Sequence, residues 1–316
     1  MTTITDQIGR ELAGRYRLEA GLGSGASAVV YLATDLRLGR QVAVKLLHAG
    51  LRGDLAFLRR FEVEAQSVAS LHHPNLLQVF DWGEEPEPFI VLELCAGGSL
   101  RDLLDGGTRL SVSQAAAVTA AAARGLAYAH RRGLIHRDVK PANVLFDEDG
   151  GVRVADFGLA RALAEAAWTE PAGSVLGTAR YASPEQAEGR PLDQRSDVYS
   201  LALVCFEAVT GKVPFSRETT VATLMARVGA LLPTAPELGP LSPILAQAAI
   251  SEPLARLDAD ELAANLELLL RNLPAPEPLP LAPRTIAGPP PAVPAGAPRR
   301  HGAATGAPAP TRAAAA

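Results

Sequence analysis

A change in the secondary-structure pattern near residue 98 constrains the fold of this chain more than any other feature. Residues 15–94 are rich in short β-type runs, and one helical segment, Leu55–Leu71, lies among them. From Ser99 onward helical segments dominate, with apolar residues at helical spacing in Asp258–Leu270. We therefore expect an α+β fold, with a small β-rich lobe at about residues 15–94 and a larger helical lobe at about residues 98–273. The segments expected as strands are Tyr16–Leu18, Val29–Ala33, Val42–Leu47, Leu76–Asp81 and Phe89–Glu93, and the other expected helices are Ser113–Arg132 and Ser196–Gly211.

Two further segments flank these lobes. Residues 1–14 are interpreted as a short N-terminal extension. From Pro274 to Ala316 the chain is dominated by proline, alanine and glycine. Because proline is excluded from the interior of helices and strands and few bulky apolar residues remain, we expect residues 274–316 to form a disordered or polyproline-II tail.

Charge and cysteine content exclude several classes of protein. The formal net charge of −4 provides no overall positive field that would attract nucleic acid. The two cysteines, Cys95 and Cys205, are too far apart to suggest a zinc site or a disulfide scaffold. The first residues do not resemble a signal peptide, and no run approaches the roughly 18 apolar residues of a membrane span. We expect a cytoplasmic protein.

The first chemical motif is glycine-rich and runs from Gly21 to Tyr31 as GLGSGASAVVY. Glycines allow a backbone turn to approach phosphate closely and to point N–H groups at it. A dinucleotide-binding motif would continue into a helix, but the β-branched Val29 and Val30 continue a strand instead.

A lysine follows on the next expected strand. The sequence Val42-Ala43-Val44-Lys45 alternates, so Lys45 projects from one face, where its ammonium can bind phosphates. Its partner would come from the helical segment Leu55–Leu71. We favour Glu64 as the partner of Lys45. Glu62, which lies on a different face of the helix, is the alternative carboxylate.

Three more motifs lie in the helical half. The first is His136-Arg137-Asp138-Val139-Lys140-Pro141-Ala142-Asn143, the second is Asp156-Phe157-Gly158, and the third spans Gly177–Glu185 as GTARYASPE. A carboxylate at Asp138 can orient an attacking hydroxyl and accept its proton. Asn143 and Asp156 supply the few oxygen ligands that Mg²⁺ takes from proteins when substrate phosphates provide the others.

In this order and at these separations, the motifs resemble those of the eukaryotic-like serine/threonine protein kinases, most of all their bacterial branch, over about residues 15–272. The resemblance implies a two-lobed kinase fold. It also implies transfer of the γ-phosphoryl group of ATP, held by Mg²⁺ or Mn²⁺, to serine or threonine hydroxyls of protein substrates.

The resemblance also implies a role for each matching residue. Asp138 is the expected catalytic base, Lys140 and Asn143 assist it, and Asn143 and Asp156 bind the metal. Glu93-Leu94-Cys95 corresponds to the hinge that hydrogen-bonds adenine, and Leu92 to the gatekeeper. Val68, Val79, His136 and Phe157 would form the column that joins the lobes. The residues expected to bind ATP are Leu22, Gly23, Ser24, Gly25, Val30, Ala43, Lys45, Glu64, Glu93, Cys95 and Leu145.

Regulatory and structural roles follow in the same way. Arg137 would bind a phosphorylated activation loop, in which one of Thr169 and Ser174 is the expected autophosphorylation site, and Thr178 would bridge Asp138 and Lys140. The structural residues implied are Asp197, which would brace the backbone around Arg137, and the Glu185–Arg256 ion pair.

Three positions depart from the family pattern: Ala28 replaces the third loop glycine, Ser183 an alanine, and Ala202 a glycine. None of these changes removes a catalytic group. Two alternatives remain at this point, namely a pseudokinase that serves as a nucleotide-binding scaffold and a small-molecule phosphotransferase. Dimerisation through the small lobe stays an open option, and the sequence names neither a protein substrate nor an input signal.

Overall fold

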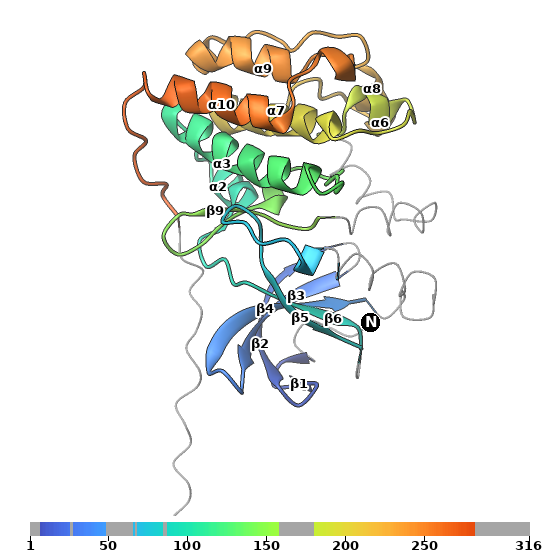
Figure 1. Cartoon of the computed structure of the whole chain (residues 1–316), viewed down its shortest axis with the longest axis vertical. Coiled ribbons are helices and arrows are strands. Elements are labelled where there is room, and N and C mark those ends of the chain that lie inside the picture. Colours follow the sequence, from blue (N-terminus) through green and yellow to red (C-terminus); the bar gives the residue numbers. More distant parts are fainter. Residues whose placement is uncertain are drawn as a thin grey trace, which may run out of the picture. The chain divides into compact units, whose positions relative to one another are not determined.

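The computed structural model confirms the expected α+β architecture, with strands gathered in one lobe and helices in the other (Figure 1). All of the described structure belongs to one compact unit, Met1–Ile286. The residues described are 7–25, 28–48, 66, 68–84, 87–157 and 180–281.

A six-stranded antiparallel sheet forms the small lobe, in the order β1-β2-β3-β4-β6-β5. Its strands are β1 (Glu11–Leu12), β2 (Tyr16–Ser24), β3 (Ala28–Asp35), β4 (Arg40–Leu47), β5 (Val79–Gly83) and β6 (Phe89–Leu92). Every expected strand is present, but β5 starts three residues later than expected. Leu76 instead makes an isolated parallel bridge to Val154 in the large lobe.

The alternation of β4 separates two apolar clusters. Val42, Val44 and Leu46 lie in a cluster confined to the small lobe. Ala43 and Leu47 lie in a second cluster, which also contains residues of the large lobe. Because side chains alternate along a strand, Lys45 shares the face of Ala43, toward the large lobe.

Helices dominate the large lobe: α2 (Leu100–Asp105), α3 (Val112–His130), α6 (Pro184–Ala187), α7 (Arg195–Thr210), α8 (Thr220–Met225), α9 (Ser242–Ala248) and α10 (Ala259–Leu270). A small antiparallel sheet joins them, formed by β7 (Gly98–Ser99), β8 (Val144–Phe146) and β9 (Val152–Val154). Short 3-10 helices cover Pro141–Asn143, Pro236–Leu241 and Pro253–Ala255.

Local sequence explains where the long helices begin and end. Ser111 caps α3 in a reciprocal pair with Gln114, and Asp258 caps α10 in the same way with Glu261. Helix α7 ends at Gly211, whose φ of 72° suits glycine. The alanines of α3 let α7 and α10 approach closely, and the three helices form one core. No helix in the described ranges combines the length and apolarity needed to cross a membrane.

Two expected segments are only partly described. Of the helical segment Leu55–Leu71, the described residues Gln66, Val68 and Ala69 are helical. Residues 274–281, at the start of the expected tail, have no regular secondary structure, yet they contact the large lobe. Gln114 Nε2 donates to the carbonyl of Glu277 at 3.1 Å, and Leu279 and Leu281 pack against the large-lobe core. The remainder of the expected tail lies outside the described residues.

Candidate active site

An ion pair between the lobes defines the candidate site. Lys45 Nζ of β4 lies 2.7 Å from Oδ1 of Asp156, which follows β9. The two residues are 111 positions apart in the chain. Burial alone would raise the pKa of Asp156, but the charge and hydrogen bond of Lys45 outweigh burial and lower it. Asp156 is therefore a carboxylate at neutral pH.

Backbone strain accompanies this pair. Asp156 and Arg137 have φ of 63° and 68°, values that side-chain-bearing residues seldom adopt. The neighbours of these two residues are in contact. His136 Nε2, next to Arg137, bonds to the carbonyl of Ala155, next to Asp156, at 2.7 Å, and the His136 ring lies 4.5 Å from that of Phe157. The surrounding contacts thus hold both segments in strained conformations, as is common at functional sites.

The loop after His136 brings three polar side chains together. Lys140 Nζ donates to Asp138 Oδ2 at 2.6 Å, and Asn143 Nδ2 donates to the Asp138 carbonyl at 2.8 Å. The backbone carbonyl of Asn143 accepts from the Ala155 N–H at 2.9 Å, one residue before Asp156. These contacts join the expected catalytic loop to the strand end that carries the expected metal ligand.

Asp197, in the first turn of α7, holds the backbone of this loop. Its two carboxylate oxygens accept from the N–H groups of His136 (2.8 Å) and Arg137 (2.7 Å). His130 Nε2 bonds to the same carboxylate at 2.7 Å. Asp197 is buried, so these hydrogen bonds satisfy a charge that would otherwise be costly. His130 belongs to none of the sequence motifs, so the sequence alone did not predict this contact.

An apolar cluster spans both lobes beside the polar groups. Its buried members include Ala43 and Leu92 from the sheet and Ala155 from the large lobe. Four of the residues expected to bind nucleotide pack against it while staying partly exposed, namely Leu22, Val30, Cys95 and Leu145. Apolar side chains beside a few polar groups are the usual lining of a small-molecule site.

The expected hinge connects the lobes next to this cluster. Glu93 donates its N–H to the Gln78 carbonyl at 2.9 Å, and its carboxylate pairs with Arg153 at 3.0 Å. Burial, together with the charge of Glu93, raises the pKa of the Cys95 thiol to about 12, so the thiol stays protonated at neutral pH.

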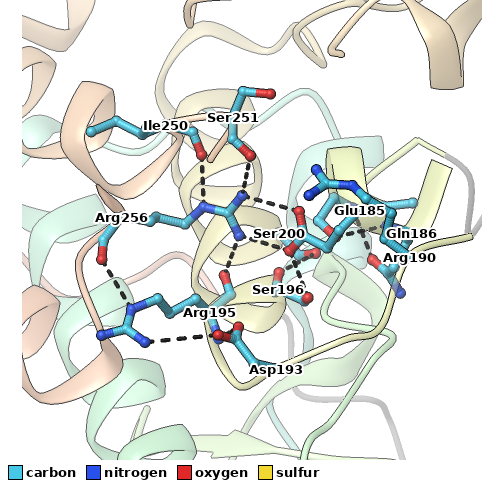
Figure 2. Close-up of polar contacts among 12 residues, drawn as sticks. Glu185, Gln186, Arg190, Asp193, Arg195, Ser196, Ser200, Ile250, Ser251 and Arg256 are labelled. Atoms are coloured by element: carbon cyan, nitrogen blue, oxygen red, sulfur yellow. Dashed lines mark hydrogen bonds and ion pairs between the residues drawn. The ribbon is translucent and has the colours of Figure 1, made fainter. Parts of the chain in front are cut away.

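A buried ion pair anchors the first turn of α6. Arg256 contacts Glu185 through two N–H···O bonds, at 2.9 and 3.1 Å, and donates its other N–H groups to the carbonyls of Arg195, Ile250 and Ser251 (Figure 2). Ser196 Oγ adds a 2.6 Å bond to Glu185. Burial would raise the pKa of Glu185, but the bonds from Arg256 and Ser196 outweigh it and lower the pKa.

The structure describes only some of the remaining residues that the sequence predicted for the site. Gly23 and Ser24 end β2, and Gly25 bonds through its N–H to the Ala28 carbonyl at 2.9 Å. Glu64, Thr169, Ser174 and Thr178 lie outside the described residues, so the expected Lys45–Glu64 pair is not described.

Two groups near the segment before α6 were missed by the sequence reasoning. Glu207 of α7 accepts from the Tyr181 hydroxyl at 2.6 Å and from Arg101 of α2 at 2.7 Å. Arg227, which follows α8, is fully buried and donates to the carbonyls of Arg180 and Ala182. Neither residue stands in a motif, and only the fold brings them to this segment.

Comparison with known proteins agrees with this geometry. The family of the protein kinase domain matches residues 16–243. A probable serine/threonine-protein kinase of Corynebacterium efficiens is 43% identical over 279 residues, 83% of this chain and 42% of that protein. The serine/threonine-protein kinase PknL of Mycobacterium bovis is 41% identical over 283 residues, 87% of this chain and 71% of that protein.

The chain thus spans about two fifths of the length of the C. efficiens relative. Among solved structures, the kinase domain of Mycobacterium tuberculosis PknI matches with a TM-score of 0.66 and 30% identity, covering 84% of this chain and 98% of that one. On these matches, and on the convergence of its motifs between two lobes, the chain belongs to the protein kinase family.

Proposed function

We propose that this chain is an active serine/threonine protein kinase that transfers the γ-phosphoryl group of ATP to protein hydroxyls. The 2.7 Å contact between Lys45 and Asp156 carries this proposal, because it brings a phosphate-binding cation and a metal-binding carboxylate together between the lobes. Asp138 is connected to Asp156 by two hydrogen bonds, one from Asn143 to the Asp138 carbonyl and one from the N–H of Ala155 to the Asn143 carbonyl. Protein kinases catalyse mainly by positioning and charge stabilisation, which is what these groups can provide.

Asn143 and Asp156 suit a divalent cation, Mg²⁺ or Mn²⁺. The amide nitrogen of Asn143 is committed to the Asp138 carbonyl, so its oxygen is the atom left to bind a metal. Asp156 has a lowered pKa and is ionised at neutral pH. When bound, such a cation would neutralise charge on the ATP phosphates.

Asp138 and Lys140 act on the reacting groups in this proposal. Asp138 orients the substrate hydroxyl and accepts its proton, while Lys140, whose Nζ lies 2.6 Å from that carboxylate, neutralises charge on the transferring phosphoryl group. A lysine two residues after the base supports serine/threonine rather than tyrosine substrates. The adenine ring would lie among Val30, Ala43 and Leu145.

Autophosphorylation at Thr169 or Ser174 is part of the proposal. Arg137 supports it, because none of the ion pairs among the described residues uses its guanidinium. A phosphate would be a suitable partner. Intact-mass analysis after incubation with Mg·ATP tests this. We expect mass gains in steps of one phosphate that disappear in the Thr169→Ala/Ser174→Ala double variant; an unchanged gain in that variant would place the phosphate elsewhere.

Transfer of radioactive phosphate from ATP to myelin basic protein, followed by phosphoamino-acid analysis, tests the main proposal. We expect label on serine and threonine for the wild type and none for Asp138→Asn, with both proteins equally folded by circular dichroism. ATP binding without any transfer would instead support the pseudokinase alternative. Transfer to a small molecule alone would support the other alternative.

A further inference from the structure

We propose that the turn Arg180–Ala182, which enters α6, is part of the surface on which a protein substrate docks, called here the substrate platform. In this proposal Arg227 is a positioning residue that fixes the backbone of this turn relative to Asp138. This inference rests on the kinase activity proposed above. Arg227 lies outside the sequence motifs, and we expect it to affect the binding of the protein substrate rather than that of ATP.

The position of Arg227 is the first observation. Arg227 follows α8 and its side chain is completely buried. One guanidinium nitrogen donates to the Arg180 carbonyl at 3.2 Å and the other donates to the Ala182 carbonyl. Both carbonyls belong to the turn that enters α6, two residues apart, so a single planar group holds the two ends of one short segment.

The missing counter-charge is the second observation. Arg256 is equally buried, but its N–H groups reach Glu185 and three carbonyls, so its charge is compensated. Within the described residues Arg227 forms no ion pair, and its Nε has no hydrogen-bond acceptor. Burial accordingly lowers the pKa of Arg227.

Among the described residues no carboxylate compensates the buried guanidinium of Arg227, and an uncompensated buried charge costs free energy. Arg227 is therefore poorly explained as a stabilising residue. Even a whole buried ion pair can often be replaced by apolar groups of similar size without loss of stability, and a buried charge without a counter-charge has less to stabilise it. What Arg227 does provide is fixed geometry at two carbonyls. A local cost that is tolerated in return for fixed geometry is typical of functional sites.

Glu207 of α7 also holds this turn. The hydroxyl of Tyr181, between the two clamped carbonyls, donates to Glu207 Oε2 at 2.6 Å. Burial and the nearby Glu207 charge raise the pKa of Tyr181, so the hydroxyl stays a donor. A buried cation and a buried anion, from two different segments, therefore fix Arg180–Ala182.

The clamped segment is coupled to the catalytic loop within a few residues. Ser183 follows Ala182 and caps α6 together with Gln186. Gln186 Nε2 then donates to the carbonyl of Arg137 at 2.8 Å, next to Asp138. Because the platform and the base are connected this closely, releasing the Arg227 bonds should disturb the position of a docked substrate relative to Asp138. The bonds of Arg227 go to the platform and not to the residues expected to bind ATP, so we expect the ATP site to stay unchanged.

The test compares Arg227→Met with Arg217→Met, a control in which an exposed arginine ten residues earlier is changed in the same way. For Arg227→Met we expect a rise of about tenfold or more in KM for myelin basic protein, the size expected for losing charged hydrogen bonds. We expect an unchanged KM for ATP, an unchanged rate of ATP hydrolysis without protein substrate, and a thermal midpoint equal to or above that of the wild type. Arg227→Lys keeps the charge and one donor direction, so its KM for myelin basic protein should lie between those of the wild type and Arg227→Met.

A purely structural role would give the opposite result. If Arg227→Met lowered the thermal midpoint and raised both KM values together, or changed neither KM, the proposal would be overturned. Amide hydrogen exchange gives a second readout that does not depend on activity. A peptide covering Arg180–Ala182 should exchange faster in Arg227→Met than in Arg217→Met, and equal exchange would refute the clamp even in a chain that transferred no phosphate.

Discussion

At the scale of single residues, the site depends on charges held in fixed pairs. Lys45 and Asp156 are 2.7 Å apart, and Lys140 and Asp138 are 2.6 Å apart. Each pair joins a lysine to a carboxylate, and at Asp156 the charge and hydrogen bond of Lys45 lower the pKa of the carboxyl group. In the proposed reaction both lysines would exchange these carboxylates for phosphate oxygens.

The first prediction concerns Lys45. We expect Lys45→Met to reduce kcat/KM for phosphotransfer by about 10²- to 10³-fold, the usual loss when one group that stabilises developing charge is removed. Loss of the Lys45 charge should also raise the pKa of Asp156, because the effect of burial is then no longer outweighed by the lysine. Steady-state kinetics provide the measurement, with the exposed Lys212→Met as control; equal kcat/KM in the two variants would contradict the role given to Lys45.

At the scale of elements, short polar networks fix the ends of strands and helices. Asp197 lies in the first turn of α7 and holds the loop before Asp138, while Glu185 lies in the first turn of α6 and binds Arg256. Each network connects segments that are distant in the chain, so its loss should disturb the position of a whole element.

The second prediction concerns the buried pair at α6. We expect Glu185→Gln to lower the free energy of unfolding by about 3 to 5 kcal/mol, because Arg256 is left as an unpaired buried charge. The exposed Glu188–Arg190 pair, 2.7 Å apart, offers the control. Glu188→Gln should cost at most about 1 kcal/mol in urea unfolding. Similar losses for both variants would show that the Glu185 pair is not buried in solution.

The third prediction is a pH dependence at the turn between β3 and β4. Asp35 accepts two hydrogen bonds from the Arg15 side chain, at 2.9 and 2.7 Å. It also accepts hydrogen bonds from the backbone N–H groups of Arg37 and Leu38. The Arg15 bonds lower the pKa of Asp35 to about 2. The unfolded chain, with an Asp pKa of about 3.9, therefore takes up protons first as the pH falls.

The contribution of Asp35 to stability is thus complete above the unfolded pKa and is lost as the pH falls toward 2. We expect the difference in unfolding free energy between wild type and Asp35→Asn to be constant above about pH 5 and to narrow below about pH 4. Denaturant unfolding between pH 3 and pH 7 measures it. A difference that widened on acidification would contradict the ion pair.

At the scale of the whole molecule, sequence patterns predicted the lobes and the motifs, and packing supplied the rest. The alternation in β4 predicted the face of Lys45, because a strand has a fixed period of two. Arg227 and Glu207 could not be found in this way, since their burial depends on segments distant in the chain. The tail was expected to begin at Pro274, yet Leu279 and Leu281 pack against the large-lobe core. The proline-rich composition around these two isolated leucines gave no sign of this contact.

The fourth prediction concerns that boundary. We expect a chain ending at residue 273 to be less stable by about 1 to 3 kcal/mol than one ending at residue 281, since it loses two partly buried leucines. Thermal unfolding of the two chains makes the comparison. Equal midpoints would mean that residues 274–281 contribute nothing to the large lobe.

Calorimetric titration of the purified chain with ATP, in the presence and absence of Mg²⁺, tests most directly whether the two lobes form one nucleotide site. We expect one ATP per chain, bound more tightly with Mg²⁺, and loss of this Mg²⁺ dependence in Asp156→Asn. Failure of the wild type to bind ATP with Mg²⁺, or the same Mg²⁺ dependence in Asp156→Asn, would contradict the site built by Lys45, Asn143 and Asp156.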